Sequence, residues 1–103
     1  QIEAPMVQAY ELTQILVGCC EQLAEALAKL RHFKDLDSHL IEIHRLENDG
    51  DRVSRDAVAA LFSNGIDPMV VIRCKHIFAV LVKAIDSTES TAHIIEGILI
   101  RNG

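Results

Sequence analysis

The sequence has no tryptophan, a single tyrosine and three phenylalanines, yet half of its 103 residues are hydrophobic. Aromatic side chains therefore cannot supply most of the core, which must be built from leucine, isoleucine, valine and alanine. Only two prolines and five glycines interrupt the chain. This composition favours helices that pack along their lengths, and the chain is long enough for one domain with its own core.

Other absences exclude several kinds of partner and location. Ten Lys and Arg against fifteen Asp and Glu give a net charge of −5, so we expect no binding to nucleic acid. The three cysteines, at positions 19, 20 and 74, do not form an even set or a zinc-knuckle spacing, which suits a reducing compartment. No apolar run approaches the ~20 residues that span a bilayer, and the first residues do not resemble a signal peptide. We therefore expect a cytoplasmic protein that is at most peripheral to a membrane.

Three long amphipathic segments account for nearly the whole chain. Apolar residues recur at helical spacing over residues 5–31, 36–63 and 68–101, which predicts a helix in each range. The first segment alternates spacings of four and three, the pattern of a heptad stripe. No segment shows the alternation of a β-strand. Because the two connections are short, we expect an all-α, up-down-up three-helix bundle, with residues 1–103 forming a single domain.

Residues that start and stop helices stand at the predicted boundaries. Asp35 or Asp37 is available to cap the second helix. Gly65 supplies a left-handed stop after it. The pair Asp67 and Pro68 is typical of an N-cap followed by the first helical position.

The predicted core lies on one stripe of each helix. The stripes are Leu12, Leu16, Cys19, Leu23, Ala26 and Leu30; Leu36, Leu40, Ile43, Ala57, Val58 and Leu61; and Val70, Cys74, Ile77, Leu81, Ala84, Ile85, Ala92, Ile95 and Leu99. Five further apolar residues of the third helix lie off its stripe: Ile72, Val80, Val82, Ile94 and Ile98. They widen the core face, or they form a contact surface for a second copy or another partner. We expect a homo-oligomer.

Two acidic residues lie on the apolar stripe of the second helix. At 100° per residue, Glu47 and Asp51 fall within about 60° of Leu36. Like charges one helical turn apart repel each other, and partial burial of an unpaired carboxylate is costlier still. Something must neutralise them, either a bound cation, a proton, or a basic side chain such as Arg52 or Lys83.

The third helix is expected to add another carboxylate. In an antiparallel hairpin, Asp86 comes level with Glu47, and Val82 comes level with Asp51. Acids on two adjacent helices form a patch that can hold a cation through oxygen ligands, although Val82 cannot ligate. Glu47, Asp51 and Asp86 are therefore candidate metal ligands, and the alternative is a salt bridge at the edge of the bundle.

His44, Glu89 and His93 are secondary candidates for the same metal site. His44 precedes Glu47 by one turn, and the other two follow Asp86 at helical spacings. The ordinary alternative for each histidine is a surface or boundary position, because lone histidines are far commoner than ligands. The sequence has no Gly-rich loop after a strand, no nucleophile elbow and no His-Glu-x-x-His motif. We therefore predict no catalytic residue and no organic cofactor.

A series of short motifs runs from residue 39 to residue 102. They are His-Leu-Ile-Glu-Ile-His-Arg-Leu-Glu-Asn-Asp-Gly-Asp-Arg-Val at 39–53, Ala-Leu-Phe at 60–62, Ile-Asp-Pro at 66–68, Lys-His-Ile-Phe-Ala-Val-Leu at 75–81, Ala-Ile-Asp at 84–86 and Ile-Glu-Gly-Ile at 95–98. Together they resemble the carboxyl-terminal half of the PhoU-like family. The most specific element is a Glu-x-x-x-Asp motif at Glu47 and Asp51. Asp86 matches the Asp of a second such motif, in which Val82 replaces the Glu.

The resemblance implies a role in phosphate transport. Members of the family generally contain two similar three-helix repeats, so this chain would be one repeat of a longer protein. Their Glu-x-x-x-Asp motifs bind metal ions, often iron or zinc, and the proteins regulate or assist phosphate uptake. One subgroup accompanies low-affinity inorganic phosphate transporters. The implied partner is a phosphate transporter or a signalling protein, and the implied cofactor is a divalent or trivalent metal ion, whose site Val82 weakens.

We therefore hypothesise a non-enzymatic regulator or accessory protein of inorganic phosphate transport with a carboxylate metal patch. Two alternatives remain. A metal-free helical scaffold is favoured by Val82. A carboxylate-metal enzyme would need inward-facing ligands from several helices and an enclosed pocket.

Overall fold

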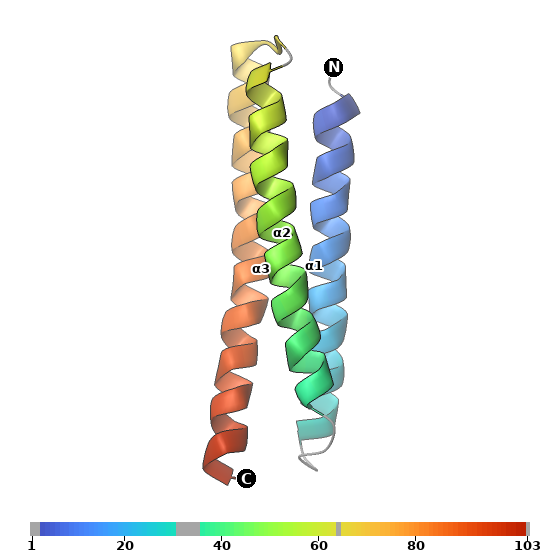
Figure 1. Ribbon diagram of the computed structural model, residues 1–103, viewed down its shortest axis with the longest axis vertical. Coiled ribbons are helices and arrows are strands. Elements are labelled where there is room, and N and C mark those ends of the chain that lie inside the picture. The colour runs from blue at the N-terminus through green and yellow to red at the C-terminus, as the bar shows by residue number, and fades with distance from the viewer. Residues whose placement is uncertain (1–2, 31–35, 64, 103) are drawn as a thin grey trace.

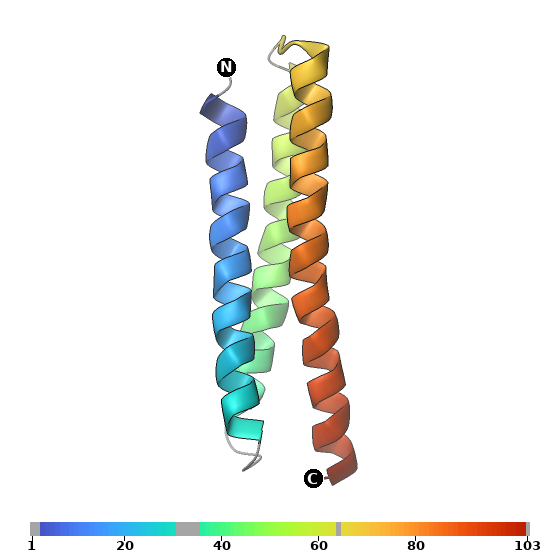
Figure 2. The same ribbon diagram turned by 180° about the vertical axis from the view of Figure 1, so that it is seen from behind.

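A computed structural model describes residues 3–30, 36–63 and 65–102, which form three helices: α1 (Glu3–Lys29), α2 (Asp37–Ser63) and α3 (Pro68–Asn102). The helices pack side by side in an elongated bundle of 54 × 18 × 15 Å (Figure 1). Successive helices run in opposite directions, so the two chain termini lie at opposite ends (Figures 1 and 2). The predicted all-α, up-down-up bundle is confirmed, and the described ranges contain no β-strand.

The helix boundaries differ little from the predicted ones. Helix α1 begins at Glu3 rather than residue 5, because Pro5 is tolerated within the first turn. It ends at Lys29 rather than residue 31. Helix α3 is continuous over 35 residues, as its unbroken apolar pattern predicts.

The turn between α2 and α3 uses the predicted residues. Gly65 has a φ of 62°, a left-handed conformation that is costly for residues with a Cβ atom. The backbone N–H of Val71 donates to the carbonyl of Asp67 at 3.0 Å. Asp67 is therefore the N-cap, and Pro68 occupies the first helical position, where its missing N–H costs nothing.

The start of α2 differs from the expectation. The N–H groups of His39 and Leu40 both donate to the carbonyl of Leu36, each at 3.1 Å, which places Leu36 at the N-cap position, where its side chain cannot accept a hydrogen bond. Asp37 is the first helical residue, so the prediction that it caps the helix was wrong. Its negative charge still favours the amino-terminal end of the helix dipole. Asp35 lies outside the described residues.

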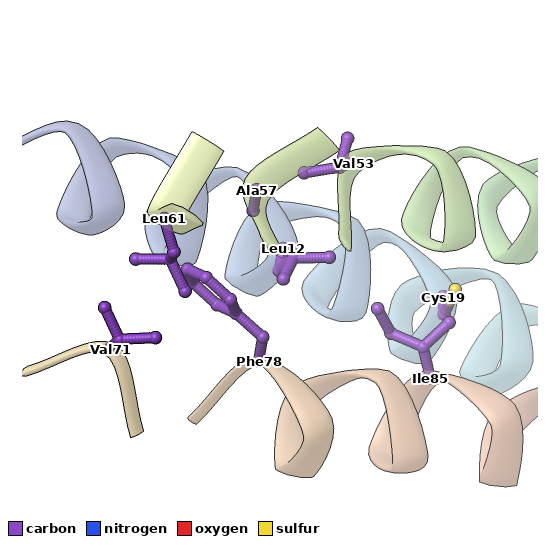
Figure 3. Close-up of a cluster of buried hydrophobic side chains, with 8 residues drawn as sticks. All are labelled: Leu12, Cys19, Val53, Ala57, Leu61, Val71, Phe78 and Ile85. Carbon is purple, nitrogen blue, oxygen red and sulfur yellow. The ribbon is translucent and has the colours of Figure 1, made fainter. Parts of the chain in front are cut away.

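Two hydrophobic clusters form the core, and each draws on all three helices. The first consists of Leu12, Cys19, Val53, Ala57, Leu61, Val71, Phe78 and Ile85 (Figure 3). The second consists of Ala26, Leu36, Leu40, Ile43, Ala92 and Ile95. Leu12, Cys19 and Ala26 are fully buried, which confirms the heptad stripe predicted for α1.

In the first half of α3, the predicted core stripe is only partly correct. The predicted stripe included Val70 and Ile77, but their neighbours Val71 and Phe78 are the buried residues, and Ile77 is 47% exposed. The ring of Phe78 points toward Leu61 of α2 (Figure 3). Apolar side chains surround this part of α3, so their spacing alone does not select a face. Contact with α1 and α2 selects it.

Three of the five off-stripe residues of α3 are exposed as predicted: Ile72, Val80 and Ile94. Val82 and Ile98 are half-buried instead, which fits the alternative of a wider core face. Val82 packs against the first core cluster, because α3 contacts both other helices and its buried face is correspondingly wide. None of the described helices combines the length and the apolar character needed to cross a membrane.

Candidate metal centre

Three carboxylates meet on the seam where α2 and α3 pack. Glu47 and Asp51 lie one turn apart on α2, and Asp86 comes from α3. One oxygen of each side chain lies within 4.8 Å of the oxygens of the other two. The structure thus brings together the three residues that sequence analysis placed first, which we call the carboxylate patch. The antiparallel register is the reason, since it sets Asp86 beside Glu47.

Glu47 is the central member of the carboxylate patch. Partial burial raises the pKa of Glu47 to about 7, and its hydrogen bond with Asp51 and the negative charge of that residue act in the same direction. The charge of Glu89 and a hydrogen bond with Asp86 add to the rise in pKa. A carboxyl group placed between two others is stable only when a proton or a cation offsets their repulsion.

Among the described residues, no Lys or Arg side chain forms an ion pair that neutralises the carboxylate patch. Arg52, a candidate from the sequence, lies instead 3.9 Å from Asp49 and 3.8 Å from Asp56. The ion pairs within residues 3–30, 36–63 and 65–102 include none from Lys or Arg to the carboxylate patch, and Lys83 is exposed. Of the three ways to neutralise the patch, the structure favours a proton or a cation.

The donor set fits a cation that prefers oxygen. Three carboxylates offer up to six oxygens, and water can complete the coordination of a hard ion. A fourth carboxylate is absent from the described seam at the level of Asp51, where Val82 packs into the core instead. This departure from the second Glu-x-x-x-Asp motif therefore exchanges a ligand for core contacts.

Gly50 brings the two helices close together beside the carboxylate patch. Gly50 is buried, and in the sequence it lies between Glu47 and Asp51. A Cβ atom built on it would lie 3.1 Å from Cδ1 of Ile85 and 3.7 Å from Cγ2 of Ile15. The contact at 3.1 Å is tighter than ordinary van der Waals packing, whereas the one at 3.7 Å is not. The missing side chain thus lets α2 approach α3 next to Asp86.

A second group of candidate ligands lies one turn further along the same seam. Nδ1 of His44 is 3.1 Å from Oε2 of Glu89, and the rings of His44 and His93 are 4.9 Å apart. One ligand atom of each of these three residues lies within 4.8 Å of the others. The sequence interpretation added them to a single site, but the structure sets them together as a separate trio.

Glu96, which the sequence pattern did not single out, also belongs to this group. Its carboxylate oxygens lie 3.6 Å from Nε2 of His44 and 3.3 Å from Nδ1 of His93. Glu96 follows His93 by three residues and therefore lies on the same helical face, a signal that was available in the sequence. We call His44, Glu89, His93 and Glu96 the histidine cluster.

The two other described histidines, His39 and His76, belong to neither group of candidate ligands. His39 is buried, and its ring joins α2 to α1 by hydrogen bonds to Gln22 at 2.7 Å and Lys29 at 2.9 Å. The Lys29 ammonium can only donate, so Nε2 of His39 accepts and Nδ1 carries the hydrogen that is donated to Gln22. His76 is exposed on α3.

The described pocket lies away from both groups of ligands. It has a volume of about 370 Å³ and sits at the turn between α2 and α3, lined by Leu61, Phe62, Gly65, Ile66, Pro68, Val71, Ile72 and Lys75. This lining is largely apolar and contains none of the candidate ligands. The candidate ligands therefore occupy an open seam rather than this pocket.

Comparison with known proteins relates the chain to a longer bacterial protein. It is 36% identical over 78 residues to the UPF0111 protein YkaA of Bacillus subtilis (strain 168). The aligned region covers 76% of this chain, and the chain spans 38% of the length of that relative. Neither a protein-family model nor a solved structure matches the chain. The alignment over most of the chain establishes that it is a distant homologue of the UPF0111 protein YkaA.

Proposed function

We propose that this chain is a non-enzymatic helical accessory or regulatory domain for inorganic phosphate transport, and that its carboxylate patch binds a metal ion. One observation carries the metal part: three carboxylates from two helices meet within 4.8 Å, and the described ion pairs give them no basic partner. A cation there would remove their repulsion and tie α2 to α3. The transport part rests on the resemblance of residues 39–102 to PhoU-like regulators, and homology to YkaA supports the relationship to a bacterial protein family.

Oxygen-only donors narrow the choice of metal for this patch. Carboxylates suit manganese, and carboxylates of helical bundles also hold iron, whereas zinc prefers nitrogen and sulfur ligands. Of the two metals that the resemblance implies, iron therefore fits Glu47, Asp51 and Asp86 better. The bound ion would act by charge neutralisation and by linking the helices.

The chain would act through helical contacts with a phosphate transporter or a signalling protein in the cytoplasm. The exposed side chains of Ile72, Val80 and Ile94 on α3 are suited to such a contact or to a second copy of the chain. The three helices would correspond to one repeat of a two-repeat protein. This arrangement is supported by the longer relative, of whose length the chain spans 38%.

A metal-free helical scaffold is the second candidate function. Val82 favours it, because this residue packs against the core where a fourth carboxylate would stand. In that case a proton shared by Glu47 with its neighbours would offset the repulsion of the carboxylates, and helix contacts alone would serve the partner.

Calorimetric titration of the metal-free protein with Mn²⁺, and with Fe²⁺ without oxygen, tests the proposal. We expect saturable binding and a raised melting temperature in the wild type. Both effects should be lost in Glu47→Gln and Asp51→Asn. Glu21→Gln is the matched control, because Glu21 is exposed on α1. If no binding depends on Glu47 and Asp51, the metal role is wrong and the scaffold function stands.

The transport role has a separate test in cells of the source organism that lack this protein. Uptake of radioactive phosphate should change when the gene is removed, and it should return when the wild-type gene is restored. Uptake that is the same in all three strains would contradict the transport role and leave the metal site untouched.

A further inference from the structure

The histidine cluster joins α2 to α3 through imidazoles and carboxylates. His44 faces acids on both sides, with Nδ1 at 3.1 Å from Glu89 and Nε2 at 3.6 Å from Glu96. His93 approaches Glu96 at 3.3 Å, and its ring lies 4.9 Å from that of His44, tilted by 42°. In the described ion pairs the partners of Glu89 and Glu96 are these histidines.

The donor chemistry of this cluster differs from that of the carboxylate patch. Imidazole nitrogen suits zinc and other borderline transition metals, while oxygen-only sets suit harder ions. Two histidines and one carboxylate are also the protein ligands of a common class of zinc site, in which water completes the coordination. His44, Glu89 and His93 each place one ligand atom within 4.8 Å of the others, so the three donors already lie near one common point.

We infer that His44, Glu89 and His93 form a second cation site, separate from the carboxylate patch, that binds a nitrogen-preferring transition metal such as Zn²⁺. This inference does not rest on the proposed function, because its ligands are different residues. Glu96 is a positioning residue that orients both imidazoles, as carboxylates beside metal-bound histidines do. The seam between α2 and α3 would then hold two sites of different metal preference one turn apart.

Zinc titration of the metal-free chain, followed by calorimetry and by NMR of ¹⁵N-labelled histidine, tests the second site. We expect the ring nitrogens of His44 and His93 to shift on addition of Zn²⁺, and those of the exposed His76 to stay unchanged. This measurement uses the wild-type protein and does not depend on the folding of a variant. Unshifted His44 and His93 signals at saturating zinc would overturn the inference.

Variants separate the second site from the carboxylate patch. His44→Gln and His93→Gln should each weaken zinc binding at least about tenfold, since loss of even an outer-shell partner costs 10–100-fold. His76→Gln is the matched control on α3 and should bind like the wild type. Glu96→Ala should weaken binding, and Glu96→Gln should restore most of it because the amide oxygen still accepts a hydrogen bond.

The two proposals fail in different ways. If zinc binding persists in Glu47→Gln and disappears in His44→Gln, the second site stands whatever the outcome for the carboxylate patch. If Glu47→Gln removes all zinc binding and the histidine variants bind normally, the inference is wrong and the carboxylate patch is the zinc site.

Discussion

Gly50 of α2 lies so close to Ile85 of α3 that a Cβ atom on the glycine would stand 3.1 Å from the Ile85 Cδ1 atom. Ile85 is only 1% exposed, so its side chain has little room to move away. Ile85 directly precedes Asp86, and Gly50 lies between the two acids of α2. The close approach of the helices at this point therefore sets the spacing of the carboxylate patch.

Replacing Gly50 with alanine tests this contact, with Gly97→Ala as the matched control. Nothing lies within 4 Å of a Cβ atom built on Gly97, so alanine there should raise the unfolding free energy by roughly 0.5–1 kcal/mol. Gly50→Ala gains the same helix propensity but overpacks the core, which costs ~1–3 kcal/mol. The unfolding free energy measured with urea should therefore be lower for Gly50→Ala than for Gly97→Ala by that cost. Equal stabilities would show that the helices can separate here.

The raised pKa of Glu47 makes the stability of the metal-free protein depend on pH. The folded chain holds this proton with a pKa of about 7, against an ordinary value of 4.5. The stabilisation that the folded state gains from holding this proton is fully present below the ordinary pKa of 4.5, and it is lost as the pH rises through about 7. We therefore expect the melting temperature of Glu47→Gln, measured with a chelator present, to rise relative to that of the wild type as the pH is raised from about 5 to about 8. A difference that stays constant over this range would contradict the assignment.

Replacing Val82 with glutamate should have opposite effects without and with metal. Val82 packs against the core, so a charged side chain should lower the melting temperature of the metal-free protein. The added carboxylate should enlarge the rise in melting temperature that Mn²⁺ produces. Each tenfold gain in affinity for Mn²⁺ adds about 1.4 kcal/mol to the binding free energy. Val82→Gln is the matched control, since glutamine has the shape of glutamate without its charge. Equal responses of the two variants to Mn²⁺ would exclude a role of this position in the patch.

The exposed apolar face of α3 should drive self-association. Ile72, Val80 and Ile94 lie within about 80° of one another around the helix, and all three are exposed. An interface worth ~8 kcal/mol would be mostly formed at tens of micromolar, so sedimentation should detect oligomers there. Ile94→Lys should shift the protein toward monomer, whereas Ile41→Lys, at an exposed position of α2, should not. A wild type that sediments only as monomer would contradict this prediction.

The fold could be predicted because its signals are local. The 3.6-residue period of apolar side chains defines each helix, and the turn chemistry of Gly65 and Pro68 defines a boundary. A short turn between two long helices also determines their antiparallel register, and from this register the meeting of Glu47 with Asp86 follows. Those inferences need only the geometry of one helix or one hairpin.

The remaining features depend on contacts between helices that are distant in sequence. Phe78 rather than Ile77 enters the core, and Val82 packs there too, because α3 is apolar on several sides and the packing of α1 and α2 decides which side is buried. The contact of Glu96 with His44 and the separation of the histidines from the carboxylate patch likewise depend on how side chains of α2 and α3 approach one another. Periodicity states which residues share a face, and only packing in three dimensions decides what each face meets.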